Sequence, residues 1–62
     1  MVVYTCPQVF YKGQLLWKNS GEAMCIVEVL NIKDDHVEIV YLGSDNTCLW
    51  TPKTALFEKH TD

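Results

Sequence analysis

The chain has 62 residues with five lysines, no arginine and eight Asp or Glu, so its formal net charge is −3. Nucleic-acid-binding proteins concentrate positive charge on one face and favour arginine forks for phosphates and guanines, so this composition argues against DNA or RNA as the main ligand. A chain this short forms one domain, residues 1–62, and buries only about 60% of the surface that its unfolded state exposes. Its 48% hydrophobic content therefore favours association with other proteins or with copies of itself.

The three cysteines, Cys6, Cys25 and Cys48, lack Cys-x-x-Cys spacing and are odd in number, which fits neither a disulfide framework nor a zinc finger. We therefore expect no metal site and a reducing, cytoplasmic location, with Cys25 as a small buried residue. No stretch approaches the roughly 20 apolar residues that span a bilayer. The first six residues also lack the basic flank and long apolar centre of a secretory signal, so we expect the mature protein to be the whole chain, without a membrane partner.

The first half of the chain predicts three strands. Residues 2–5 are β-branched and aromatic and precede Pro7, which cannot donate to a ladder, so they predict a short edge strand. Residues 14–18 predict a second strand that ends in a tight hairpin turn at Asn19-Ser20-Gly21. Residues 23–30 are partly apolar on both faces, which predicts a central strand that is covered twice.

The second half predicts two further strands and a short helical turn. Residues 31–35 carry turn formers and charge, and residues 36–41 then alternate with the period of two of a half-buried strand. A turn at residues 43–46 leads to a strand at 47–50, and Pro52 fixes φ for a single 3-10 turn through Ala55. Leu56 and Phe57 are expected to close a barrel, and residues 60–62 to form a frayed polar tail. The whole pattern predicts an all-β fold, a small five-stranded SH3-like barrel.

The order Phe10-x-x-Gly13, Lys18-x-Ser20-Gly21, two strands and Pro52-x-x-Ala55-Leu56 resembles small bacterial and phage SH3-like barrels. The resemblance covers most of the chain with few identities. One such family, the plasmid-borne type II dihydrofolate reductases, resembles the chain at the Gly, Lys-x-Ser-Gly and Pro-x-x-Ala-Leu positions. It implies a tetramer with an active pore built around a Val-Gln-Ile-Tyr motif directly before the proline.

The chain departs from that reductase motif, since the matching positions are Cys48, Leu49, Trp50 and Thr51. Leu49 and Thr51 supply neither the amide nor the phenol that the family motif uses to hold the pterin and the nicotinamide. Lys18 matches a family lysine that attracts anionic groups, which makes it a candidate anion contact. We therefore expect no bound cofactor and keep a ligand-binding or reductase-like oligomeric barrel only as an alternative.

Two other resemblances concern the same outline. Short uncharacterised bacterial proteins share it, which implies the fold and no function. Tudor-type barrels are also similar, and they hold methylated Lys or Arg in an aromatic cage by cation–π attraction. Such a cage would use Tyr11, Trp17, Tyr41 and Trp50; the interpretation that we favour makes Tyr41 and Trp50 part of the core, because a small barrel needs large fillers.

The sequence contains no recognisable catalytic constellation. Asp34, Asp35 and His36 adjoin one another, but their setting is typical of a solvated turn. Neither Ser20 nor Ser44 lies in a G-x-S-x-G elbow, and no glycine-rich loop is present to hold phosphates. We therefore expect a protein that is not an enzyme.

What remains is binding by exposed apolar side chains. If Leu16 faces the core, the period of two places Leu15 and Trp17 on the outer face, where they need a cover. Tryptophan is also a favoured hot-spot residue at interfaces. The sequence therefore predicts a protein-interaction module that binds a protein partner or forms a homo-oligomer. Its predicted partner-binding residues are Leu15, Trp17, Trp50 and Tyr11. Its size and acidic charge suit an accessory protein of a phage or mobile element.

Overall fold

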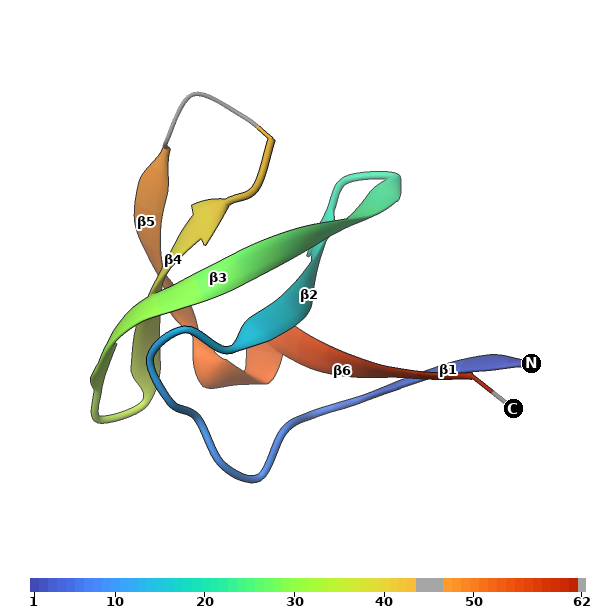
Figure 1. The fold of residues 1–62 in the computed structure, drawn as a ribbon, viewed down its shortest axis with the longest axis horizontal. Coiled ribbons are helices and arrows are strands. Elements are labelled where there is room, and N and C mark those ends of the chain that lie inside the picture. The colour runs from blue at the N-terminus through green and yellow to red at the C-terminus, as the bar shows by residue number, and fades with distance from the viewer. Residues whose placement is uncertain (44–46, 62) are drawn as a thin grey trace.

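A computed structural model describes residues 1–43 and 47–61 and has six strands in one antiparallel sheet, in the order β1-β6-β2-β3-β4-β5 (Figure 1). The strands are β1 (Val2–Thr5), β2 (Leu15–Ser20), β3 (Ala23–Lys33), β4 (His36–Tyr41), β5 (Cys48–Pro52) and β6 (Leu56–Thr61). A single 3-10 turn, η1 (Lys53–Ala55), joins β5 to β6. The all-β prediction is confirmed, with six strands where five were expected.

The two tight hairpins depend on residues that tolerate a positive φ. Gly21 has a φ of 67° in the turn where Ser20 of β2 pairs with Ala23 of β3, as the Ser-Gly pattern indicates. Asp34 has a φ of 50° between β3 and β4, and aspartate is among the few side chains that adopt this region. The strand β3 is longer than predicted because residues 31–33 pair with β4 instead of forming the turn. Residues 44–46 of the other predicted turn lie outside the described residues.

The sheet is curled because η1 joins two strands that are far apart in its order. Four residue steps of about 2 Å each carry the chain from β5 to β6. Three strands lie between them in the sheet, so on a flat sheet they would be about 19 Å apart. β6 nevertheless pairs with β2, through Trp17↔Phe57 and Lys18↔Leu56. The sheet therefore has an inner face, which holds the core, and an outer face. Its hydrogen-bonded order remains open, with β1 and β5 as the edges.

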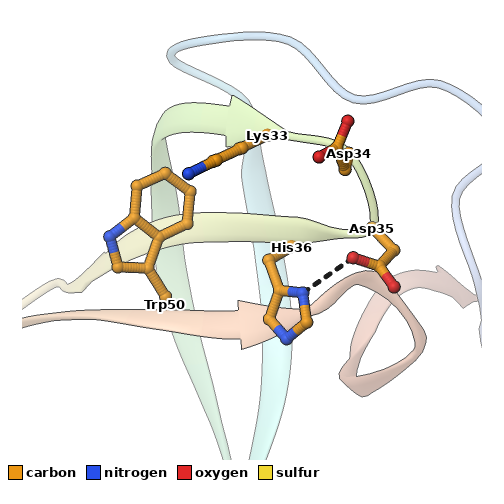
Figure 2. A pocket seen from close by; sticks show the side chains of 5 residues that line it. All are labelled: Lys33, Asp34, Asp35, His36 and Trp50. Atoms are coloured by element: carbon orange, nitrogen blue, oxygen red, sulfur yellow. Dashed lines mark hydrogen bonds and ion pairs between the residues drawn. The ribbon is translucent and has the colours of Figure 1, made fainter.

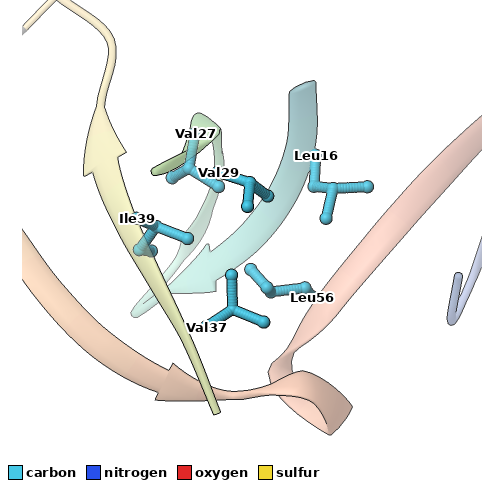
Figure 3. Close-up of a cluster of buried hydrophobic side chains, with 6 residues drawn as sticks. All are labelled: Leu16, Val27, Val29, Val37, Ile39 and Leu56. Atoms are coloured by element: carbon cyan, nitrogen blue, oxygen red, sulfur yellow. The ribbon is translucent and has the colours of Figure 1, made fainter. Parts of the chain in front are cut away.

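The hydrophobic core lies on the inner face and draws on four strands (Figure 3). Alternate residues of β2, β3 and β4 supply it, because successive strand side chains point to opposite faces. Its fully buried members are Leu16, Val27, Val29, Val37, Ile39 and Leu56, and Phe10, Tyr41 and Leu49 pack against them. Because the core is this small, each member carries a large share of the stability.

Two predictions about single segments are wrong. Residues 60 and 61 are not a frayed tail: they belong to β6, which pairs with β1 from Val2↔Thr61 to Thr5↔Glu58. A 2.8 Å hydrogen bond between Thr5 Oγ1 and His60 Nε2 adds to this pairing. Asp62 lies outside the described residues. Cys25 is half-buried, not fully buried, and its register partner on β2 is Lys18.

Candidate functional site

The strand register gathers apolar side chains on the outer face of the sheet. Leu16 is 1% exposed in the core, so its neighbours Leu15 and Trp17 point outward. Register partners share a face, and Trp17 is paired with Ile26 on one side and Phe57 on the other. Leu15 is the register partner of Glu28 on β3, and Glu28 is in turn the register partner of Val40 on β4. We call Leu15, Trp17, Ile26, Val40 and Phe57 the outer patch.

Trp17 is half-buried because the β1–β6 pair covers part of its ring. The Tyr4 ring meets it edge-on, with centroids 6.4 Å apart and an interplanar angle of 65°. Lys59 Nζ lies 4.8 Å from the centroid of the indole, a cation–π distance. Tyr4 and Lys59 are themselves register partners. The cover that the sequence called for at Trp17 thus comes in part from the chain itself, whereas Leu15 remains 55% exposed.

Trp50 lies outside the core and 47% of its surface is exposed, so the interpretation as a core residue is wrong. Its neighbours Leu49 and Thr51 face inward, opposite Ile39 and Val37, which turns the indole to the outer face. Tyr41, in contrast, is half-buried and packs against the core.

Trp50 lines an open pocket of about 350 Å³ at the β3–β4 turn, together with Lys33, Asp34, Asp35 and His36 (Figure 2). His36 Nδ1 and Asp35 Oδ1 are 2.9 Å apart. This hydrogen bond holds the pKa of the Asp35 carboxyl below its ordinary value. Both side chains are well exposed, and the described residues contain no group of three or more metal-ligating side chains. The turn is therefore solvated, as its sequence indicates.

Tyr11 belongs to a different region, the loop between β1 and β2. It lines a second pocket, of about 500 Å³, with Thr5, Cys6, Gln8, Val9, Gln14, Glu58 and His60. Gln14 anchors this loop: its Oε1 accepts a hydrogen bond from the Tyr11 backbone N–H, and its Nε2 donates one to the Val9 carbonyl. Both distances are 3.2 Å, and Gln14 is only 9% exposed. A glutamine after a glycine gives no sequence signal for this role.

Lys18 lies beside Tyr41, with its Nζ 5.9 Å from the centroid of the ring. The Tyr41 hydroxyl is 3.1 Å from Ser20 Oγ. The hydrogen bond with Ser20 lowers the pKa of Tyr41, burial opposes the shift, and Lys18 adds to the lowering. The role of Lys18 as an anion contact stays a prediction.

The residues of the two alternative sites do not gather as those alternatives require. Of the four rings proposed for a cage, Trp17 contacts Tyr4 and Tyr41 packs against the core. The other two line different pockets, Trp50 at the β3–β4 turn and Tyr11 at the β1–β2 loop. An aromatic cage needs its rings around one ligand. At the positions of the reductase motif, Leu49 packs against the core and Thr51 is buried. Their side chains are thus engaged in the fold.

No protein-family model, curated protein or solved structure matches this chain. In the part of the chain that the structure describes, no helix has both the length and the apolar character needed to cross a membrane.

Proposed function

We propose that this protein is a non-enzymatic protein-interaction module, built on an SH3-like barrel, which docks through the outer patch. The barrel is supported by the succession of β2, β3, β4 and β5 as antiparallel neighbours, followed by a 3-10 turn that returns β6 to β2. In this arrangement β2 to β6 are the five barrel strands, and β1 is an additional edge strand.

The observation that carries the function is the exposure of Leu15 beside the aromatic rings of the outer patch. Burying apolar surface gains about 25 cal/mol per Å², and a large aliphatic residue gains about 1.5–3 kcal/mol when it is fully covered. Trp17 offers a ring whose orientation Tyr4 and Lys59 already restrict, so little side-chain entropy is lost on binding. An apolar anchor next to a fixed indole is a favourable centre for an interface.

The other hypotheses have less support. The inward positions of Leu49 and Thr51 weigh against a reductase-like pore, and the separation of Trp17, Trp50 and Tyr11 weighs against a methyl-lysine cage. The odd number of cysteines supports a reducing, cytoplasmic setting. Small size and acidic charge support an accessory role in a phage or mobile element, by analogy alone.

The test uses Leu15→Asp, because Trp17→Ala would also remove the contacts of Tyr4 and Lys59. A partner captured with the wild-type protein is purified and titrated against wild type, Leu15→Asp and the control Thr54→Asp, whose charge is placed on the exposed η1 turn. We expect Leu15→Asp to weaken binding at least tenfold, about 1.4 kcal/mol, and Thr54→Asp to leave it within twofold. Equal affinities for all three proteins would refute docking through the outer patch.

A further inference from the structure

The strand β1 has one backbone edge without a strand neighbour among the described residues. It pairs with β6 alone, and the two strands extend from the rest of the sheet as a narrow ribbon (Figure 1). All four residues of β1 are exposed, including Val2, Val3 and Tyr4. Two-stranded ribbons are only marginally stable in water and gain from a further strand. We infer that β1 pairs edge to edge, antiparallel, with β1 of a second copy of this chain.

The composition of β1 favours this pairing because its side chains give the open edge no protection. Natural sheets guard an open edge with charged side chains, proline or a bulge. The opposite edge, β5, ends in Pro52, which lacks the N–H that another strand would need. β1 contains no proline and no charge, and its pairing with β6 runs without a register shift.

The distribution of charge favours the β1 edge as the place where a second copy meets the first. Residues 1–11 carry no charged side chain, although 21% of the chain is charged. Two copies, each with a net charge of −3, carry a net repulsion between them. At the β1 edge they meet without like charges in opposition. A partner strand that bound through charged side chains would find no charged side chain in β1 to pair with.

In one register of this pairing, two identical β1 strands place favourable side-chain pairs opposite each other. A two-fold axis perpendicular to the sheet keeps inner and outer faces aligned only when residues of the same face lie opposite one another. With Val3 on the axis, Val2 lies opposite Tyr4 of the second copy on the outer face. Pairs of an aromatic and a β-branched residue are among the favourable cross-strand pairs. Tyr4 also contacts Trp17, so the joined sheets extend the apolar outer surface across the junction.

Sedimentation equilibrium of wild type, Val3→Lys and the control Thr54→Lys tests the inference. We expect a wild-type dimer, whose dissociation constant rises at least tenfold in Val3→Lys because two ammonium groups then meet near the axis. Thr54→Lys should leave the constant within twofold. Circular dichroism checks that each variant is folded.

A cross-linking variant keeps the inference testable if Val3→Lys does not fold. In a chain with Cys6→Ser, Cys25→Ala and Cys48→Ser, the change Val3→Cys places two thiols opposite each other on the axis, within the Cα separation that a disulfide spans. We expect it to form a covalent dimer on mild oxidation, and Thr54→Cys in the same background to form no cross-linked dimer. Equal cross-linking of the two would contradict the pairing.

The outcomes separate this inference from the docking role of the outer patch. A dimer that Leu15→Asp dissociates and Val3→Lys does not would overturn edge pairing and place self-association on the outer patch. A wild-type protein that is monomeric at millimolar concentration would overturn edge pairing while the titration of a different protein partner still tests the outer patch. Loss of the dimer in Val3→Lys, with Leu15→Asp unchanged, supports the pairing through β1.

Discussion

Replacing Gln14 with methionine tests whether one buried amide anchors the β1–β2 loop. Methionine has a similar volume and adapts its shape, so the change removes the hydrogen bonds and leaves the packing. Two bonds of 3.2 Å are lost, to the Tyr11 N–H and to the Val9 carbonyl. At a net value of about 1 kcal/mol each, the expected loss is about 2 kcal/mol. A chain of this size has a total stability of roughly 3–9 kcal/mol, so this loss is a large fraction.

Urea denaturation measures the effect of Gln14→Met. For a domain of this size the slope is about 1 kcal/mol per molar urea, so the midpoint should fall by about 2 M while the slope stays the same. The matched control is Gln8→Met in the same loop, where the side chain is exposed and the free energy of unfolding should change by less than about 0.5 kcal/mol. A loss below about 0.5 kcal/mol for Gln14→Met would refute its role as the anchor.

Three further changes test the core and the two perturbed groups. Leu16→Ala should lower the free energy of unfolding by about 2–5 kcal/mol in urea denaturation, since Leu16 is fully buried, and a loss below about 1 kcal/mol would contradict the core. Ser20→Ala should raise the pKa of Tyr41, which NMR of its Cζ signal can follow. Because that pKa is lowered in the folded state, the stability that the group contributes is present above the ordinary tyrosine pKa and is lost as pH falls through the folded value. A titration midpoint that does not move would count against the Ser20 hydrogen bond as the cause. His36→Gln should raise the pKa of Asp35. The contribution of this carboxyl to folding stability is present above the ordinary carboxyl pKa and is lost on acidification. An NMR titration in which the pKa of Asp35 does not change would exclude the His36 hydrogen bond as the cause of its lowered value.

Period-two alternation predicted much of the sheet, because it reflects which side chains face the core. With Leu16 in the core, it placed Leu15 and Trp17 on the outer face; Leu16 is 1% exposed and Leu15 is 55% exposed. Glycine chemistry likewise located the hairpin at Gly21, which has a positive φ. These signals are local, since each depends on neighbours in the sequence.

The features that the sequence did not predict depend on contacts between distant segments. Pairing of β1 with β6 orders residues 60 and 61, which look like a polar tail by themselves. The exposure of Trp50 follows from the inward positions of Leu49 and Thr51. The sequence interpretation instead assigned Trp50 to the core, because a small barrel needs large fillers. The cover that Tyr4 and Lys59 give Trp17 also requires the fold.

NMR chemical-shift mapping of the labelled protein with its captured partner tests the central claim most directly. Docking through the outer patch predicts that the largest amide shifts fall on β2, β3 and β6 around Leu15 and Trp17. Largest shifts at the β3–β4 turn near Trp50, or in the β1–β2 loop near Tyr11, would contradict the claim.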